Sequence, residues 1–195
     1  MKVVIIKYNA GNIRSVLFAL ERIGVEAIVT DEPDEIRSAD RVIFPGVGEA
    51  STAMKYLREK GLDKLICSLT QPVLGICLGM QLMCSFSEEN NTECLGIFDQ
   101  KVRLFPENGF KIPQIGWNNI TNLKSTLFDG VEESAYMYFV HSYYVESCNN
   151  AISKTDYILE FSSAIQKNNF SAVQFHPEKS GEAGQKIIEN FIKGI

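Results

Sequence analysis

The feature that most constrains the fold is a cysteine between two glycines, directly after an apolar run, in the segment from Pro72 to Gln81 (PVLGICLGMQ). Such a run is typical of a strand that turns sharply into a helix, and flanking glycines ease the reversal. The N-terminus of the following helix favours a thiolate and a developing oxyanion. Cys77 is therefore a candidate nucleophile, although a cysteine at such a junction can also be a small buried hydrophobe.

A nucleophilic cysteine needs a base, and the chain has only two histidines, His141 and His176. His176 ends a strand-like run, and Pro177 biases it away from the helical region. Residues two apart in an extended segment share a side, so Glu178 can approach and orient the imidazole. A surface turn with an incidental ion pair is the alternative. His141 lies in the apolar run of residues 136–145, where a strand histidine near the pocket is the simpler interpretation.

These residues resemble the class I (triad) glutamine amidotransferases, which have a Gly-x-Cys-x-Gly elbow, a later His-x-Glu and an upstream glycine-rich oxyanion loop. All three motifs occur here in that order. Within the family, further motifs resemble those of the glutaminase subunit of imidazole glycerol phosphate synthase, from histidine biosynthesis. The segments that carry the resemblance span essentially the whole chain: 8–12 (YNAGN), 45–48 (PGVG), 75–81 (GICLGMQ), 115–118 (IGWN), 138–143 (YFVHSY) and 174–179 (QFHPEK).

The resemblance implies hydrolysis of the glutamine side-chain amide to glutamate and ammonia by the catalytic triad Cys77, His176 and Glu178. Backbone N–H groups of Val47 and Leu78 would hold the oxyanion. The other residues expected to bind glutamine are Gly46, Gly48, Gln81, Glu89, Ser142 and Tyr143. Glu89 belongs to an acidic run that can equally be a solvated helix end, whereas Gln81 shares a helix face with Cys77.

A partner enzyme is also implied, because ammonia released into water at neutral pH becomes non-nucleophilic ammonium. By resemblance, the partner is a separate (β/α)8-barrel cyclase that forms a heterodimer with this chain and makes imidazole glycerol phosphate and AICAR. Positions that match the family interface are Asn12, Trp117, Asn118 and Lys179. Trp117, the only tryptophan, is a candidate aromatic anchor or else a core residue. Ala10 stands where relatives often carry proline, which leaves the rigidity of the entrance loop open.

Composition fits this interpretation without establishing it. At 195 residues and 45% hydrophobic, the chain can bury a core as one domain spanning residues 1–195. A net charge of −5 argues against nucleic acid or an anionic membrane as the main partner. There is no long apolar span, and a strand-like N-terminus replaces a signal peptide, so we expect a cytoplasmic protein. The five cysteines include no close pair, so we expect neither disulfides nor a metal site, and no cofactor.

Alternating strands and helical periods in the first ninety or so residues predict an α/β fold, with a mostly parallel central sheet flanked by helices. Strands are expected at 2–7, 27–30, 41–44 and 73–76, with helices at 49–60 and after Asn12, a candidate N-cap. Further strands, which add antiparallel pairs, are expected at 101–105, 136–145, 158–161, 164–166 and 170–175, with a hairpin turn at 167–169 and a last helix at 182–193. The resemblance implies the single-domain, flavodoxin-like fold of class I glutamine amidotransferases.

Other functions also have sequence signals to weigh. Nucleotide binding at Gly46-Val47-Gly48 is disfavoured because Ser51 takes the third glycine position and no Gly-Lys-Ser/Thr occurs. A glutaminase for another synthase, of the anthranilate or GMP type, is disfavoured by the Gly-Trp-Asn segment. A stand-alone cysteine hydrolase of the same fold would keep the triad and need no partner, and a noncatalytic binding module is disfavoured because all triad residues are present.

Overall fold

A computed structural model describes residues 1–9 and 11–194, so the prediction about Ala10 lies outside the described residues. Strands and helices alternate through the first half of the chain. Their bounds are β1 Val3–Ile6, α1 Ile13–Arg22, β2 Ala27–Thr30, α2 Pro33–Arg37, β3 Arg41–Gly46, α3 Ala50–Glu59, α4 Leu62–Cys67, β4 Val73–Cys77 and α5 Leu78–Met83. Helix α3 begins where the Glu49 carboxylate accepts hydrogen bonds from the N–H groups of Ser51 and Thr52.

Strands dominate the second half. Their bounds are β5 Phe86–Ser87, β6 Thr92–Glu93, β7 Lys101–Leu104, β8 Gln114–Asn119, β9 Tyr136–His141, β10 Tyr143–Glu146, β11 Ala151–Tyr157, β12 Leu159–Lys167 and β13 Phe170–Val173. The helical elements of this half are η1 Glu89–Asn91, η2 Thr126–Phe128, η3 Pro177–Lys179 and α6 Gly181–Lys193. The predicted turn between β12 and β13 is confirmed, since Lys167 pairs with Phe170 across two asparagines.

The central sheet has the order β2-β1-β3-β4-β13-β12-β10-β7-β5-β6, with β11 beside β12. Strands β2, β1, β3, β4 and β13 are parallel, and β12, β10 and β7 continue the sheet in antiparallel fashion. Gly46 pairs with Cys77 and Val173 with Ile76, so three strands end together. Their carboxyl ends therefore bring the glycine-rich loop, the cysteine and the histidine segment to one edge of the sheet.

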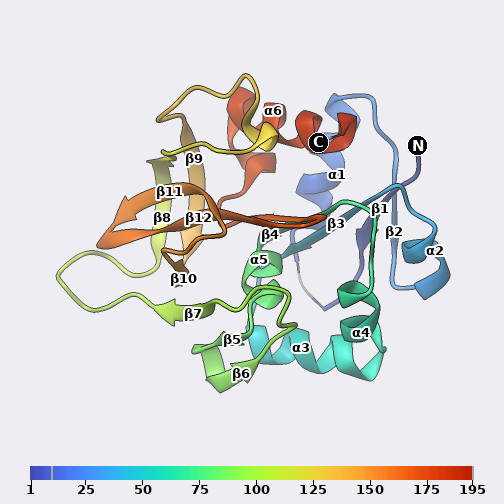
Figure 1. Cartoon of the computed structure of the whole chain (residues 1–195), viewed down its shortest axis with the longest axis horizontal. Helices are drawn as coiled ribbons and strands as arrows, with labels where there is room; N and C mark the ends of the chain where they lie inside the picture. The colour runs from blue at the N-terminus through green and yellow to red at the C-terminus, as the bar shows by residue number, and fades with distance from the viewer. Residues whose placement is uncertain (10, 195) are drawn as a thin grey trace.

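Helices cover both faces of the sheet, as Figure 1 shows, with α1 and α6 on one side and α3, α4 and α5 on the other. Each face has its own apolar core. Val16, Leu20 and Ile188 belong to the first core, whereas Leu57 and Leu62 belong to the second. Burying apolar side chains on both faces explains why the strands between them are nearly continuous hydrophobic runs.

Several predicted elements differ from the observed ones. The run 136–145 is two strands, β9 and β10, because the chain turns at Ser142 and enters a different sheet. The expected strands 158–161 and 164–166 form the single strand β12, since its small buried serines do not interrupt pairing. Strands β8 and β11 were not expected, because their polar residues hide the two-residue period.

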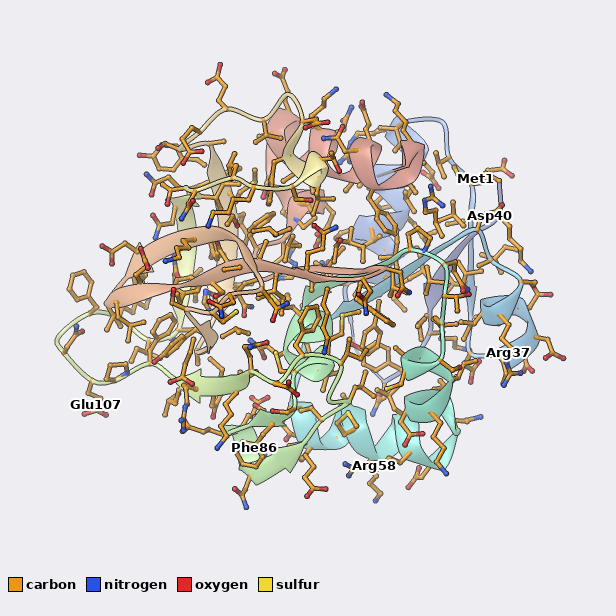
Figure 2. All side chains as sticks on the ribbon, in the orientation of Figure 1. Met1, Arg37, Asp40, Arg58, Phe86 and Glu107 are labelled. Carbon is orange, nitrogen blue, oxygen red and sulfur yellow. The ribbon has the colours of Figure 1, made fainter. Side chains whose placement is uncertain are left out.

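Strands β8 and β9 pair in a separate antiparallel sheet at one end of the molecule. The loop that leads into β8 projects from the body, and Figure 2 shows Glu107 on this loop, across the molecule from Met1. Ile115 and Trp117 on β8 are more than half exposed. This small sheet therefore presents apolar side chains to solvent beside the edge where the functional segments meet.

Candidate active site

Cys77 stands at a strained turn between β4 and α5, with φ 54° and ψ −107°. We expected the flanking glycines, Gly75 and Gly79, to ease the sharp turn by their backbone freedom. Neither takes a positive φ, so this reason is wrong, and the glycines instead allow close packing. A Cβ at Gly79 would lie 1.9 Å from the carbonyl oxygen of Phe44. Helix α5 can therefore pack this closely against β3 only with glycine at position 79. The strained backbone conformation is at Cys77 itself.

His176 and Glu178 form a buried pair, with His176 Nδ1 2.8 Å from Glu178 Oε1. The pairing arises from the short 3-10 helix η3, and not from an extended segment as the sequence suggested. The His176 N–H donates to the Tyr138 carbonyl at 2.9 Å, and Ser180 Oγ donates to the His176 carbonyl at 2.6 Å. The histidine backbone is thereby anchored to β9 on one side and to the start of α6 on the other.

Burial, Cys77 and Glu178 together determine the charge of His176. Burial works against a charged imidazole, but the Cys77 sulfur and the Glu178 carboxylate outweigh it and raise the pKa of His176 to about 10. At neutral pH the ring therefore holds its second proton. Among the described residues, His176 Nε2 has no hydrogen-bond partner in this state. Catalytic hydrogen bonds are often long or misaligned until substrate binds.

Asn12 belongs to this cluster. Its Nδ2 donates to Glu178 Oε1 and lies 3.4 Å from His176 Nδ1. Asn12 stands at the N-cap position of α1, as predicted, but its φ of 73° is left-handed and its side chain makes no capping hydrogen bond. The side chain instead reaches across to η3 and helps to fix the carboxylate.

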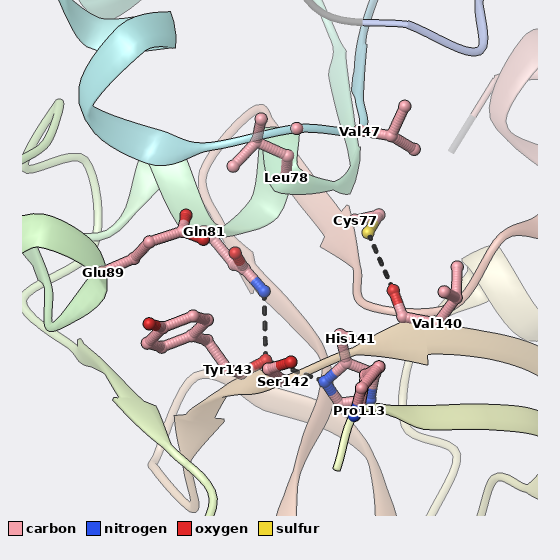
Figure 3. A pocket seen from close by; sticks show the side chains of 11 residues that line it. Val47, Cys77, Leu78, Gln81, Glu89, Pro113, Val140, His141, Ser142 and Tyr143 are labelled. Carbon is pink, nitrogen blue, oxygen red and sulfur yellow. Dashed lines mark hydrogen bonds between the residues drawn. The ribbon is translucent and has the colours of Figure 1, made fainter.

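A cavity of about 280 Å³ opens beside Cys77 (Figure 3), at the small end of the range for ligand pockets. Most of the expected site residues line it, together with Pro113, Val140 and His141. The expected residues among the lining are Val47, Gly48, Cys77, Leu78, Gln81, Glu89, Ser142 and Tyr143. Gly46 is buried beneath the loop, where a Cβ would collide with the Tyr8 hydroxyl, while His176 and Glu178 do not line the cavity.

Glu89 and Cys77 lie at opposite ends of the cavity in Figure 3. Glu89 Oε2 accepts a hydrogen bond from the Ala50 N–H at 2.7 Å, which ties the carboxylate to the first turn of α3. Partial burial, together with nearby Glu49, raises the pKa of Glu89, although the Ala50 hydrogen bond opposes the shift. The cavity thus has a sulfur nucleophile at one end and a carboxylate at the other.

His141 is a wall residue with both ring nitrogens engaged. Nδ1 donates to the Tyr143 carbonyl at 2.7 Å. In the neutral ring Nε2 is then an acceptor, so the Gln114 side-chain amide, 3.1 Å away, must turn its NH₂ group toward it. Burial lowers the pKa of His141 to about 4, and the neighbouring charge of His176 adds to the shift. The ring is therefore neutral at physiological pH and holds the β9–β10 turn in place.

The loop after β3 faces the elbow. The Val47 carbonyl accepts a hydrogen bond from the Gly11 N–H at 3.3 Å, which ties the loop to the segment before α1. Within residues 1–9 and 11–194, the Val47 N–H donates no hydrogen bond. Leu78 is the first residue of α5, where backbone N–H groups lack the usual partner one turn back.

Three of the four residues expected at a partner interface, Trp117, Asn118 and Lys179, lie on or beside the small sheet. Trp117 is 57% exposed, so the core alternative for the tryptophan is wrong. It packs edge-on against Tyr138, and Lys179 Nζ lies 5.8 Å from the centre of the same ring. Asn118 Nδ2 donates to the Asp156 carbonyl at 3.0 Å. Trp117, Tyr138 and Lys179 form one patch next to the triad segment.

Gln174 is a site residue that the sequence reasoning did not single out. It is fully buried, and its Nε2 lies 3.7 Å from Cys77 Sγ. Its position two residues before His176 is a signal that could have found it, because residues two apart in an extended segment share a side. Across the described ranges, no group of three or more His, Cys, Asp or Glu residues is placed to hold a metal ion. In the same residues, no helix combines the length and apolarity needed to cross a bilayer.

Comparison with known proteins agrees with this geometry. The sequence matches the family glutamine amidotransferase class-I over residues 4–195. The imidazole glycerol phosphate synthase subunit HisH of Bacteroides fragilis is 58% identical over 195 residues, which span 99% of this chain and 100% of that protein. The HisH subunit of Haemophilus influenzae is 44% identical over 196 residues, spanning 100% and 98%.

Solved structures share the fold. A putative GMP synthase protein from Thermoplasma acidophilum superposes with a TM-score of 0.75 at 18% identity, covering 99% of this chain and 93% of that one. PurLQS from Thermotoga maritima gives a TM-score of 0.72 at 15% identity, covering 98% and 97%. The expected fold, a largely parallel sheet with antiparallel strands added in the C-terminal half, is confirmed.

Proposed function

Since the chain belongs to the class I glutamine amidotransferases and, among them, to the HisH subunits of imidazole glycerol phosphate synthase, we propose that it hydrolyses glutamine and supplies the ammonia to a cyclase in histidine biosynthesis. The observation that carries the chemistry is the strained Cys77 elbow, which lines a small cavity and lies close to the buried His176–Glu178 pair. We take residues 1–195 as one glutamine amidotransferase domain, an assignment supported by the family match over residues 4–195.

The reaction begins with attack of the Cys77 thiolate on the amide carbon of glutamine. The carbonyl electron pair moves to oxygen, where N–H groups of Leu78 and Val47 stabilise the charge; losing one such donor typically costs about 10²–10³ in rate. His176 gives its proton to the departing ammonia, leaving a thioester. His176 then takes a proton from water, which attacks the thioester and releases glutamate and the thiolate. Glu178 stabilises the imidazolium in both halves.

The cavity suits an α-amino acid that has its side-chain amide at Cys77. Glu89, at the other end, is placed to receive the α-ammonium group, and its attachment to α3 keeps it there. Gln81 and the backbone of Ser142 and Tyr143 form the wall between these ends. Gly48, which lines the cavity, allows the loop backbone to approach the amide closely.

The partner is a separate (β/α)8-barrel cyclase in a heterodimer. The patch of Trp117, Tyr138 and Lys179 supports a docking site there, since an exposed tryptophan beside a cation is a frequent interface anchor. Asn118 follows Trp117 on β8, and Asn12 contacts the triad through Glu178. Docking on this face would place the cyclase next to the site where ammonia forms.

The test measures glutamate release from glutamine by the purified chain, alone and with the cyclase and its nucleotide ligand. Cys77→Ala is the control, and it should abolish glutamine-dependent turnover while leaving ammonia-dependent turnover by the cyclase intact. Stimulation that needs both Cys77 and the cyclase supports the assignment. Equal turnover without the cyclase points to a stand-alone hydrolase, and loss of both activities in the variant contradicts the proposed division of labour.

A further inference from the structure

The buried amide of Gln174 touches the reacting sulfur but has no part in the mechanism above. Gln174 follows β13, and its backbone N–H donates to the Ser163 carbonyl at 2.8 Å, which fixes the residue against β12. Its side chain is completely buried, and Nε2 lies 3.7 Å from Cys77 Sγ, within hydrogen-bond reach of a sulfur acceptor. A buried amide directed at a nucleophile is placed to alter its charge state.

The orientation of this amide is fixed by Gln81. Gln81 Nε2 donates to Gln174 Oε1 at 3.0 Å and to the Tyr143 carbonyl at 3.0 Å. Because the Tyr143 acceptor is a backbone carbonyl, the Gln81 amide must present its NH₂ group there, and the same NH₂ group reaches Gln174. Gln174 must then use its oxygen toward Gln81, which leaves its own NH₂ group facing the sulfur.

Within the described residues, the sulfur consequently has hydrogen-bond contacts of two opposite kinds. The Val140 carbonyl, 3.9 Å from Cys77 Sγ, can accept a hydrogen bond only from the thiol. The Gln174 N–H can donate to the sulfur in either state and binds a thiolate more strongly, because charge-assisted hydrogen bonds are the stronger kind. Loss of the thiol proton therefore removes the contact with Val140 and strengthens the contact with Gln174.

We propose that Gln174 stabilises the Cys77 thiolate through its side-chain N–H, and that Gln81 and the Tyr143 carbonyl hold the Gln174 amide in the orientation this requires. The proposal rests on the glutaminase function proposed above and adds a donor to the nucleophile, separate from the oxyanion donors. Gln81 also lines the cavity, so one side chain supports the thiolate donor and borders the substrate.

The first test measures the fraction of Cys77 that is thiolate and needs neither glutamine nor cyclase. Alkylation of Cys77 by iodoacetamide is followed by peptide mass spectrometry from about pH 4 to pH 9, because only the thiolate reacts. In Gln174→Met the apparent pKa of Cys77 should rise by about one unit, the shift expected for one lost hydrogen bond to a charged group. Gln100→Met, the same change at a partly buried glutamine outside the cavity, should leave it unchanged. An unchanged pKa in Gln174→Met overturns the proposal.

The second test uses Gln174→Glu, which keeps the shape and the oxygen that accepts from Gln81. The introduced carboxyl donates to sulfur when protonated and repels the thiolate when ionised. In the complex with the cyclase, the kcat for glutamine hydrolysis should be at least about tenfold below wild type at pH 8, with part of the loss recovered toward pH 6 and KM nearly unchanged. A wild-type kcat, or a loss that does not vary with pH, overturns the proposal.

The two tests separate the proposals from each other. If the wild-type complex fails to hydrolyse glutamine, the proposed function is wrong, and the alkylation profile still decides the role of Gln174. If the wild type hydrolyses glutamine while both variants keep the wild-type thiol pKa and kcat, the role of Gln174 alone is wrong. Circular dichroism of each variant shows whether it is folded. If Gln174→Met does not fold, the pH dependence of kcat in Gln174→Glu tests the role of Gln174.

Discussion

The buried His141 gives the stability of this fold a pH dependence that a single substitution isolates. Its ring lies among three aromatic rings, with centroids 5.3 Å from Phe105, 5.6 Å from Phe139 and 5.4 Å from Phe161. Burial in these surroundings lowers the pKa of His141 from 6.5 to about 4. Unfolding exposes the ring to water and restores its ordinary pKa.

The sign follows from proton binding. Between pH 6.5 and pH 4, His141 binds a proton in the unfolded chain but not in the folded chain. Its contribution to stability is therefore complete above pH 6.5 and is lost as the pH falls toward 4. From these two pKa values, the free energy of unfolding should fall by about 2 kcal/mol at pH 5 and by about 3 kcal/mol at pH 4.

The assay is urea unfolding by circular dichroism near pH 7.5 and near pH 5, for the wild type and for His141→Asn. Carboxylates titrate in both proteins and lower the free energy of unfolding of each. The loss in the wild type minus the loss in the variant is therefore the contribution of His141. The wild type should lose about 2 kcal/mol more than the variant. Equal losses in the two proteins, or an imidazole NMR signal that titrates near its ordinary pKa, would refute the argument.

Three further predictions follow from the site and the surface. His176→Asn should abolish glutamine-dependent turnover, whereas His141→Asn should retain far more of it; steady-state kinetics with the cyclase checks the pair, and the reverse order would mean that His141 is the base. Gly79→Ala should destabilise the fold by more than about 2 kcal/mol in urea unfolding, because its Cβ would lie 1.9 Å from the Phe44 carbonyl oxygen; a wild-type midpoint contradicts this. Trp117→Ala should shift stability by less than about 0.5 kcal/mol but weaken cyclase binding at least about tenfold by calorimetry; unchanged affinity would remove Trp117 from the interface.

The sequence pattern predicted those parts of the fold that depend on interactions between residues close together in the chain. The strand before Cys77, the apolar stripe of α1 and the turn at 167–169 are each encoded within a few residues. Strand β8 could not be found this way, because it pairs with β9 in a separate sheet and exposes Trp117 and Ile115, whereas a buried strand would hide them. The break at Ser142 is likewise invisible in a continuous apolar run, since it reflects which sheet each half joins.

The site shows the same division. Cys77, His176 and Glu178 carry recognisable spacing, so the sequence could propose them together. For Asn12 the local sequence pattern predicts only a helix cap, because asparagine before an apolar stripe is a common capping signal. Its contact with Glu178 joins residues 166 apart in sequence, and Gln174 meets Cys77 across 97 positions. Such contacts depend on strand order, which no local pattern records.

The two histidines illustrate how the fold assigns roles that residue type alone leaves open. His176 faces a sulfur and a carboxylate, so its proton is retained up to a pKa of about 10, whereas His141 faces aromatic rings and a carbonyl and stays neutral down to about 4. Stability linked to His176 is therefore complete below pH 6.5 and is lost as the pH rises toward 10, opposite to that of His141. Together they favour the folded state most near pH 6.5, with a proton on the ring that must give one to ammonia and none on the ring that lines the substrate cavity.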